Sequence, residues 1–262
     1  ARAAARALEM VDEGADIIDV GGESSRPPAY GEAVKLTVAE EVDRVVPAIA
    51  AIRQQSDVPI SVDTTKAEVA QRAIDSGADI INDISALDDD GMAGVAASSR
   101  APVVLMHRRG TPATMQRDTH YDDLLGEVRD FLDERCRVAL SAGIARDHVA
   151  VDPGIGFGKS VVANFALLRY LSFFARPGQP LLIGASRKSF LWKPAGLSPD
   201  EALEGSLAAA AVATANGANV IRTHDVLATT RVVRVAESIC NAQVVAGGLS
   251  RPSLAARDVE RW

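Results

Sequence analysis

The 262-residue sequence has few cysteines, no long apolar run and no excess of basic residues. The two cysteines, Cys136 and Cys240, are too few and too far apart for a disulfide framework or a zinc site, and they fit a reducing cytoplasm. No apolar stretch approaches the roughly 20 residues that a bilayer span requires. Acidic residues outnumber basic ones by 35 to 28, so we expect neither a nucleic acid nor a membrane as partner.

The rest of the composition is that of an ordinary globular protein. Hydrophobic residues make up 47% and charged residues 24% of the chain, which excludes a disordered or fibrous protein. No low-complexity linker or charge run divides the sequence. We therefore predict a single domain over 1–262, of which about 240–262 form a C-terminal tail.

The first residues are rich in alanine and carry two arginines, a composition that transit peptides share. Their apolar positions recur at helical spacing, however, at Ala4, Ala7, Leu8 and Val11. We therefore predict an amphipathic helix that ends at Gly14 and leads directly into a strand, so that the chain begins inside a fold.

One unit recurs along the chain: a short apolar run, a polar or glycine-rich cluster, and then an amphipathic helix. Such continuous apolar runs are typical of parallel strands that are buried on both faces. Gly-Ala precedes three of the runs, at 14–15, 77–78 and 217–218, as expected for helix C-caps that connect directly to strands. The predicted strands are 17–20, 60–62, 80–84, 103–106, 149–151, 181–183 and 220–221.

The alternation of strands and helices predicts an α/β fold, a (β/α)₈ TIM barrel. Seven strands are predicted where a closed barrel needs eight, and the chain opens on a helix. We therefore expect the first strand and the loop that follows it to precede residue 1. The competing architecture, an open doubly wound sheet, predicts a glycine-rich phosphate fingerprint after an early strand, and the sequence has none.

All seven predicted strands end in polar or ionisable residues. A single aspartate in that place is most often a helix N-cap. Seven such ends, mixing acids, amides and bases, would meet at one mouth of a barrel, where the active sites of this fold lie. We therefore predict a ligand site at that mouth. The strand ends in question are 19–23, 63–64, 82–83, 106–107, 152–154, 186–188 and 222–224.

The residue types at these ends indicate the chemistry of the ligand. Asp63, Asn82 and Asp152 suit a planar heterocycle with adjacent ring N–H and amino donors. Lys188 suits the carbonyl or a ring nitrogen of the same heterocycle. The cations indicate an anionic substrate or leaving group, most simply a phosphate, over which the loop at 21–27 would close. These cations are Arg26, Lys188, Arg222 and His224.

Seven collinear motifs resemble those of the dihydropteroate synthase family. They lie at the ends of successive predicted strands, and the resemblance runs in order from about residue 3 to residue 238. Each motif is weak alone, but seven in order are specific. They are Asp-Val-Gly-Gly-Glu-Ser-Ser-Arg-Pro at 19–27, Ser-Val-Asp-Thr at 61–64, Ile-Asn-Asp-Ile-Ser at 81–85, Met-His at 106–107, Asp-Pro-Gly-Ile-Gly-Phe-Gly-Lys at 152–159, Gly-Ala-Ser-Arg-Lys-Ser-Phe at 184–190 and Arg-Thr-His-Asp-Val at 222–226.

The resemblance implies a barrel enzyme of folate biosynthesis. This transferase joins 6-hydroxymethyl-7,8-dihydropterin diphosphate to 4-aminobenzoate and releases pyrophosphate, and sulfonamides inhibit it. Its mechanism is dissociative: the bond to diphosphate breaks first, and the amine then attacks a stabilised pterin cation. The chain offers no clear nucleophile dyad, which fits a reaction that depends on electrostatics and on exclusion of water.

The resemblance also implies roles for residues of this chain. The implied pterin contacts are Asp63, Asn82, Met106, Asp152, Phe157, Lys188 and Arg222. The implied 4-aminobenzoate contacts are Ser25, Arg26, Pro27, Phe157, Lys188 and Ser189. The implied diphosphate ligands are Arg222 and His224, and the implied catalytic residues are Arg26, Lys188, Arg222 and His224.

Mg²⁺ is the cofactor that the resemblance implies. In the family, an asparagine of the first loop contacts the ion, and we expect that loop to precede residue 1. No metal ligand is therefore predicted in this chain, and we expect the chain as written to bind a pterin but to turn over slowly. Pro28 stands where the family usually has glycine, and it predicts a stiffer second loop.

Two other functions stay open at this point. One is a methyltransferase barrel that acts on methyltetrahydrofolate with a corrinoid protein, but it would need no cations for a diphosphate. The other is a non-catalytic pterin-binding paralogue, which we would expect to have lost Arg26 or Lys188.

We also predict a cytoplasmic homodimer. The segment 207–213 is apolar nearly all round, whereas a helix on the outside of a barrel should keep a polar face. Packing of this segment against a second copy would explain the pattern. Packing under the C-terminal segment from Gln243 is the alternative explanation.

Overall fold

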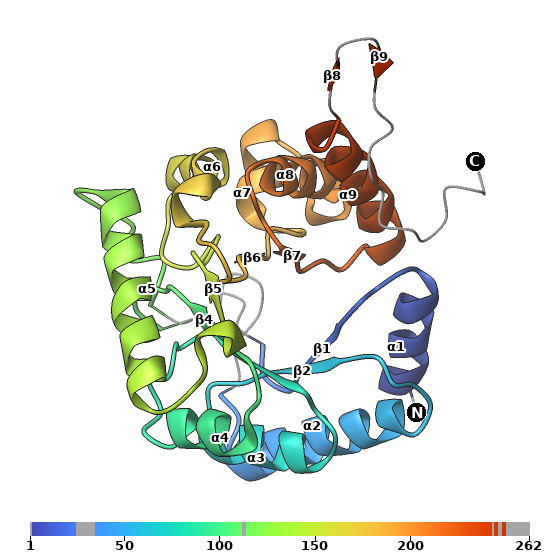
Figure 1. The fold of residues 1–262 in the computed structure, drawn as a ribbon, viewed down its shortest axis with the longest axis vertical. Helices are drawn as coiled ribbons and strands as arrows, with labels where there is room; N and C mark the ends of the chain where they lie inside the picture. The colour runs from blue at the N-terminus through green and yellow to red at the C-terminus, as the bar shows by residue number, and fades with distance from the viewer. Residues whose placement is uncertain (1, 25–34, 112–113, 243, 246–247, 250–262) are drawn as a thin grey trace.

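The computed structural model describes residues 2–24, 35–111, 114–242, 244–245 and 248–249. Within these residues, seven strands run parallel to one another in chain order through the centre of the molecule, and helices lie outside them (Figure 1). This arrangement confirms the predicted α/β barrel class.

Strands β1 to β5 form one continuous parallel sheet in sequence order. They are β1 (Ile18–Gly21), β2 (Ile60–Asp63), β3 (Ile80–Asp83), β4 (Val103–Met106) and β5 (Val149–Asp152). Strands β6 (Leu182–Ile183) and β7 (Val220–Ile221) pair in parallel with each other, and a parallel bridge between Val151 and Leu181 connects β5 to this pair. Each strand lies within one residue of its predicted ends.

The first and last of these parallel strands have one strand neighbour each. Within the described residues, β1 pairs with β2, β7 pairs with β6, and no backbone pairing joins β1 to β7. The segment between α1 and β1 nevertheless approaches the last helix, because a Cβ atom at Gly14 would lie 3.2 Å from Cγ2 of Thr230.

Helices alternate with the strands, as predicted. The α-helices are α1 (Arg2–Asp12), α2 (Val38–Arg53), α3 (Ala67–Asp75), α4 (Met92–Ser99), α5 (Leu124–Ser141), α6 (Val161–Arg169), α7 (Ser189–Trp192), α8 (Leu203–Ala215) and α9 (Val226–Cys240). Short 3₁₀ turns lie at Arg146–His148, Leu171–Phe174, Lys193–Ala195 and Pro199–Glu201. Helix α2 shows the local logic: Thr37 and Glu40 form a capping box at its start, and it buries Val45, Ile49 and Ile52 against the sheet.

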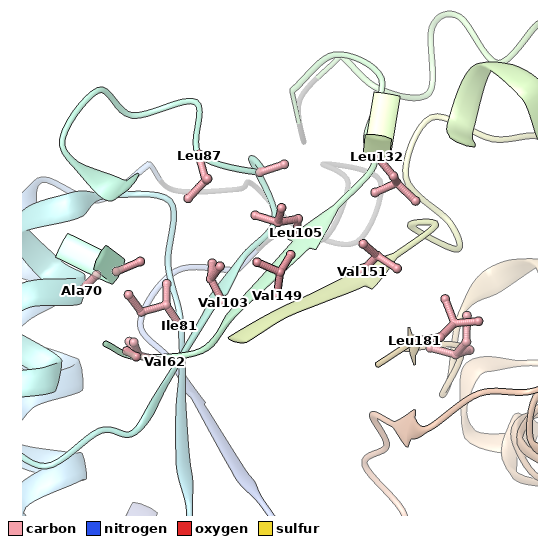
Figure 2. Packing of buried hydrophobic residues seen from close by; sticks show 14 of the residues in the cluster. Val62, Ala70, Ile81, Leu87, Val103, Leu105, Leu132, Val149, Val151 and Leu181 are labelled. Carbon is pink, nitrogen blue, oxygen red and sulfur yellow. The ribbon is translucent and has the colours of Figure 1, made fainter. Parts of the chain in front are cut away.

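The core lies between the strands and this helical layer. Aliphatic side chains from neighbouring strands, among them Val62, Ile81, Val103 and Val151, pack into one buried cluster with helical residues such as Leu132 (Figure 2). Burial of each large aliphatic side chain stabilises the fold by about 1.5–3 kcal/mol. The core therefore holds the strands in place, and with them the polar residues at the strand ends.

Three glycines confirm the predicted connections between helices and strands. Gly14, Gly77 and Gly217 have φ angles of 100°, 107° and 95°, in the left-handed region that other residues rarely adopt. Each ends a helix and lies a few residues before a strand.

The C-terminal end of the chain contains an element that the sequence analysis did not predict. After α9 ends at Cys240, Val244–Val245 (β8) and Gly248–Leu249 (β9) form an antiparallel pair that projects away from the helices (Figure 1). No helix in the described ranges is long and apolar enough to cross a membrane.

Candidate active site

One arginine connects the carboxyl ends of three strands. Arg222, which follows β7, donates from Nε to Asp19 of β1 at 2.6 Å and from Nη2 to Asp63 of β2 at 3.0 Å. The side-chain amide of Asn82, in β3, lies 3.4 Å from both carboxylate oxygens of Asp19. Residues that are far apart in the sequence therefore form one polar cluster at the predicted mouth of the barrel.

This cluster carries more carboxylates than cations. Burial and the neighbouring Asp19 raise the pKa of Asp63 to about 7, and Arg222 only partly opposes them. Burial alone would lower the pKa of Arg222, but the two carboxylates outweigh it and raise that pKa above its ordinary value. Arg222 is therefore a fixed cation beside two acids, of which Asp63 can change charge near neutral pH.

The loop between β5 and α6 brings Asp152 and Phe157 to the same mouth. Glycines 154, 156 and 158 have φ angles of 71°, 84° and 67°, so the loop follows a path that side chains would disfavour. The path is also tight, because a Cβ atom at Gly154 would lie 1.8 Å from the carbonyl oxygen of His107. The N–H of Gly154 donates to Asp152 at 2.7 Å and orients its carboxylate.

Lys188 extends from the loop after β6 over this β5–α6 loop. Its ammonium donates to the carbonyl oxygen of Ile155 and lies 4.5 Å from the centre of the Phe157 ring. Burial lowers the pKa of Lys188 to about 8. Burial also raises the pKa of Asp152, while the charge of Lys188 opposes that change. Lys188 and Asp152 thus lie close enough for their opposite charges to act on each other.

An apolar wall accompanies these charges. Met106, the last residue of β4, and Phe157 share a small buried cluster with Ile84 and Met115. This cluster is separate from the main core, and its members come from loops and strand ends at the mouth. A flat ring bound at Asp63, Asn82 and Asp152 would have this apolar surface near it.

The loops after β6 and β7 are fastened to each other. Nδ1 of His224 lies 3.1 Å from the hydroxyl of Ser186, and Arg187 makes two hydrogen bonds to Asp225, at 3.0 and 2.5 Å. Arg187 has a φ of 59°, a strained backbone for a residue with a side chain. This pairing sets where the neighbouring Lys188 and His224 lie. Ser189 begins helix α7.

A second ionic cluster lies beside Asp63. Lys66 donates to Glu23 at 2.7 Å and to Glu41 at 2.5 Å, and Glu23 also accepts the backbone N–H of Leu36 at 3.1 Å. The side chain of Glu41 is only 1% exposed. The cluster thus connects the end of the 19–23 segment to Leu36, two residues before α2, and to Glu41 within α2. The predicted contacts Ser25, Arg26 and Pro27, like Pro28, lie outside the described residues.

One polar residue at a strand end has a structural role instead of facing the site. Asp83 is fully buried and accepts hydrogen bonds from the backbone N–H groups of Ser85, at 2.8 Å, and Leu87, at 2.6 Å. Its carboxylate therefore shapes the turn after β3. Here the ordinary structural role of a strand-end aspartate applies.

The sequence analysis gave no role to several residues that the structure brings to this region. Asp19 holds Arg222, Glu41 holds Lys66, and Lys159 is a buried residue of the β5–α6 loop itself. Glu41 carried a usable signal: it lies four residues before Val45, on the helix face that packs on the sheet. A charged residue at a core position indicates a buried partner.

Taken together, the described mouth offers acceptors for N–H donors, one fixed guanidinium, a lysine over an aromatic ring and an apolar wall. Such a site can bind a flat, amino-substituted heterocycle and can stabilise negative charge that develops beside it.

Known proteins are similar to this chain in both sequence and fold. Residues 1–224 match the family model described as "Pterin binding enzyme". The chain is 46% identical over 236 residues to a dihydropteroate synthase of Synechocystis sp., covering 89% of this chain and 80% of the relative, and 44% identical over 234 residues to that of Escherichia coli, covering 89% and 82%.

Two solved structures show the likeness in three dimensions. The Yersinia pestis dihydropteroate synthase with a sulfonamide drug complex matches with a TM-score of 0.86 at 40% identity, covering 90% of this chain and 84% of that one. The Xanthomonas albilineans dihydropteroate synthase with 4-aminobenzoic acid matches with a TM-score of 0.83 at 40% identity, covering 90% and 83%.

Proposed function

Because the chain belongs to the dihydropteroate synthase family, we propose that it joins 6-hydroxymethyl-7,8-dihydropterin diphosphate to 4-aminobenzoate. The observation that best supports this reaction is the cluster of Asp63, Asn82 and Arg222 at one mouth, together with the Asp152–Lys188 pair. In this proposal Asp63, Asn82 and Asp152 bind the N–H and amino groups of the pterin, and Lys188 binds its acceptor edge. Met106 and Phe157 line its faces.

The reaction then needs charge stabilisation more than a strong base. As the C–O bond to diphosphate breaks, the leaving group takes the bonding electrons. Arg222 and His224 would stabilise that negative charge. The amine of 4-aminobenzoate forms the new C–N bond and afterwards gives up a proton. Ser189, Lys188 and Phe157 would bind 4-aminobenzoate together with Ser25, Arg26 and Pro27.

Mg²⁺ remains part of the proposal because of the family, in which the ion assists departure of the diphosphate. In the described residues, no group of three or more His, Cys, Asp or Glu side chains could hold a metal ion. Asp19 and Asp63 are both engaged by Arg222. The described residues of this chain therefore supply no ligand set for Mg²⁺.

Sulfonamides, which compete with 4-aminobenzoate in the family, are the proposed inhibitors. A cytoplasmic location is proposed as well, since Cys136 and Cys240 are both free, as is typical of proteins in a reducing compartment.

A homodimer through the later helices is proposed on the basis of exposed apolar side chains. Helices α6 and α8 pack together, and Val162 and Phe165 of α6 and Val212 of α8 are exposed by 75%, 46% and 45%. Sedimentation at micromolar concentration should show a dimer, and V162E combined with V212E should give a monomer. Glutamate in place of the exposed Ile17 should leave the dimer intact. A wild-type protein that sediments as a monomer would contradict this proposal.

The reaction is tested by incubating the purified protein with the pterin diphosphate, 4-aminobenzoate and Mg²⁺. Dihydropteroate and pyrophosphate should form in equal amounts, and a sulfonamide should suppress both. Pterin binding without any product after long incubation would instead indicate the non-catalytic paralogue. Methyl transfer from methyltetrahydrofolate to a corrinoid would indicate the methyltransferase.

A further inference from the structure

Lys159 is a buried lysine that contacts no substrate in the proposed reaction. It ends the β5–α6 loop, and only 3% of the residue is exposed. Burying an ammonium group costs several kcal/mol unless partners compensate for the lost water. The partners of Lys159 therefore indicate why a lysine lies there.

Two direct partners hold the ammonium. It donates to the carbonyl oxygen of Phe157 at 3.0 Å and lies 2.9 Å from Nδ1 of His107. Burial, together with the charges of Lys159 and Arg109, lowers the pKa of His107 to about 3, so the ring is neutral. Nδ1 then accepts from Lys159, and the ring proton lies on Nε2.

The same two partners support the pterin contacts of the proposed site. His107 donates its backbone N–H to the carbonyl oxygen of Asp152 at 2.9 Å, and its own carbonyl lies in the space that a side chain at Gly154 would need. Phe157 faces Lys188. The two lysines thus hold the β5–α6 loop at two carbonyls, Lys188 at Ile155 and Lys159 at Phe157.

The charged groups around Lys159 show on which pterin contact its own charge acts. The groups that act on it are Asp152 from β5, Lys188 from the loop after β6, and His107 and Arg109 from the end of β4 and the loop that follows. Asp152 is the one acid among them, and Lys159 opposes the rise that burial causes in the pKa of Asp152. The hydroxyl of Tyr121 donates to the carbonyl oxygen of Gly158, next to Lys159, at 3.0 Å.

We propose that Lys159 is a positioning residue for pterin recognition, which fixes the β5–α6 loop through Phe157 and His107 and places a positive charge near Asp152. The inference rests on the proposed pterin site. It adds a residue that touches no substrate to the machinery that recognises one.

The charge of Lys159 can be separated from its shape by pH. Burial lowers the pKa of Lys159 to about 7, so the amine is charged below that pH and neutral above it. The charge with which Lys159 opposes the raised pKa of Asp152 is therefore present below about pH 7 and is lost above it.

The test compares binding of 6-hydroxymethylpterin to the wild type, Lys159→Met and Lys159→Gln from pH 5.5 to 8.5 by calorimetry. Both variants should bind about tenfold more weakly than the wild type at pH 6, because they lack the charge near Asp152. The ratio should shrink towards pH 8.5, where Lys159 of the wild type is neutral as well. Ionisation of the ligand affects all proteins equally and cancels in the ratio. Because Gln keeps a donor for the Phe157 carbonyl, it isolates the charge, and it serves alone if the Met variant does not fold.

Arg53→Met is the matched control. Arg53 is also a cation that holds backbone carbonyls, those of Gly77 at 2.8 Å and Val58 at 3.0 Å, but it does so at the opposite ends of the strands. It should lower stability without a pH-dependent change in affinity. A ratio for the Lys159 variants that is constant with pH, or full rescue by Gln, would overturn the proposed role. Absence of binding by the folded wild type would instead refute the pterin site itself.

Discussion

Arg222 and Asp19, 203 residues apart in the chain, are joined by a 2.6 Å hydrogen bond between Nε and a carboxylate oxygen. The contact spans the place where β7 and β1 have no backbone pairing in the described part of the chain. The same guanidinium holds Asp63, a predicted pterin contact, so one side chain connects the proposed diphosphate and pterin sites.

We predict that Arg222→Ala lowers turnover by about 10²–10³, the usual loss when one preorganised donor to developing negative charge is removed. Arg222→Lys should recover little, because an ammonium cannot replace a planar guanidinium that bonds two carboxylates at once. The measurement is pyrophosphate release under saturating substrates. Arg176→Ala, which breaks an ion pair with Asp133 in the helical layer, should leave the rate unchanged. An Arg222→Ala variant as fast as wild type would remove Arg222 from the proposed mechanism.

Asp63 should make stability depend on pH. Its folded pKa of about 7 exceeds the ordinary value near 4, so the folded state binds more protons than the unfolded state between these limits. Stability contributed by this group is present at low pH and is lost as pH rises from about 4 to 7. Asp63→Asn should therefore gain about 1.4 kcal/mol relative to wild type for each pH unit in this window. Urea unfolding at pH 4.5, 5.5 and 6.5 measures the difference, and a constant difference would contradict the raised pKa.

Lys66 should be important for stability. Its removal leaves the buried Glu41 beside Glu23 without the cation that both bind, a loss of about 3–5 kcal/mol. Lys66→Met should therefore lower the free energy of unfolding strongly, and a second change, Glu41→Gln, should restore part of it. Arg137→Met breaks an exposed pair with Glu134 and should change little. Equal unfolding curves for Lys66→Met and wild type would show that the cluster contributes nothing.

Gly154 should be among the least replaceable glycines. Gly154→Ala places a Cβ atom 1.8 Å from the His107 carbonyl oxygen at a φ of 71°, so the β5–α6 loop must move. Gly178→Ala is the matched control: its φ is 73°, but nothing lies within 4 Å of the added atom. The control should lose about 1 kcal/mol, from backbone strain alone. Gly154→Ala should lose clearly more, and pterin affinity with it. Equal melting temperatures for the two variants would contradict the close approach.

The strands and their connections could be predicted from the sequence because local chemistry decides them. Four-residue apolar runs such as 103–106 are typical of parallel strands that are buried on both faces. Gly14, Gly77 and Gly217 mark the turns before strands. Site residues at the strand ends could also be predicted, because the carboxyl ends of the strands in a barrel converge on one mouth.

Partners of side chains could not be predicted in the same way. A lysine after glycine in a polar loop is usually solvated, and only the tertiary structure buries Lys159 against His107, 52 residues away. Asp19 and Arg222 meet because two ends of the sheet come together, which no local pattern shows. The β8–β9 pair was missed because Val244–Val245 lacks the preceding Gly-Ala pair that marks the equally short strand at 220–221.

A calorimetric titration of 6-hydroxymethylpterin into the wild type and into Asp152→Asn tests the pterin site most directly. We predict that the wild type binds one equivalent and that the variant, which lacks the buried carboxylate, binds about 10²-fold more weakly with an unchanged fold. Equal affinity of the two proteins, or no binding by a folded wild type, would contradict it.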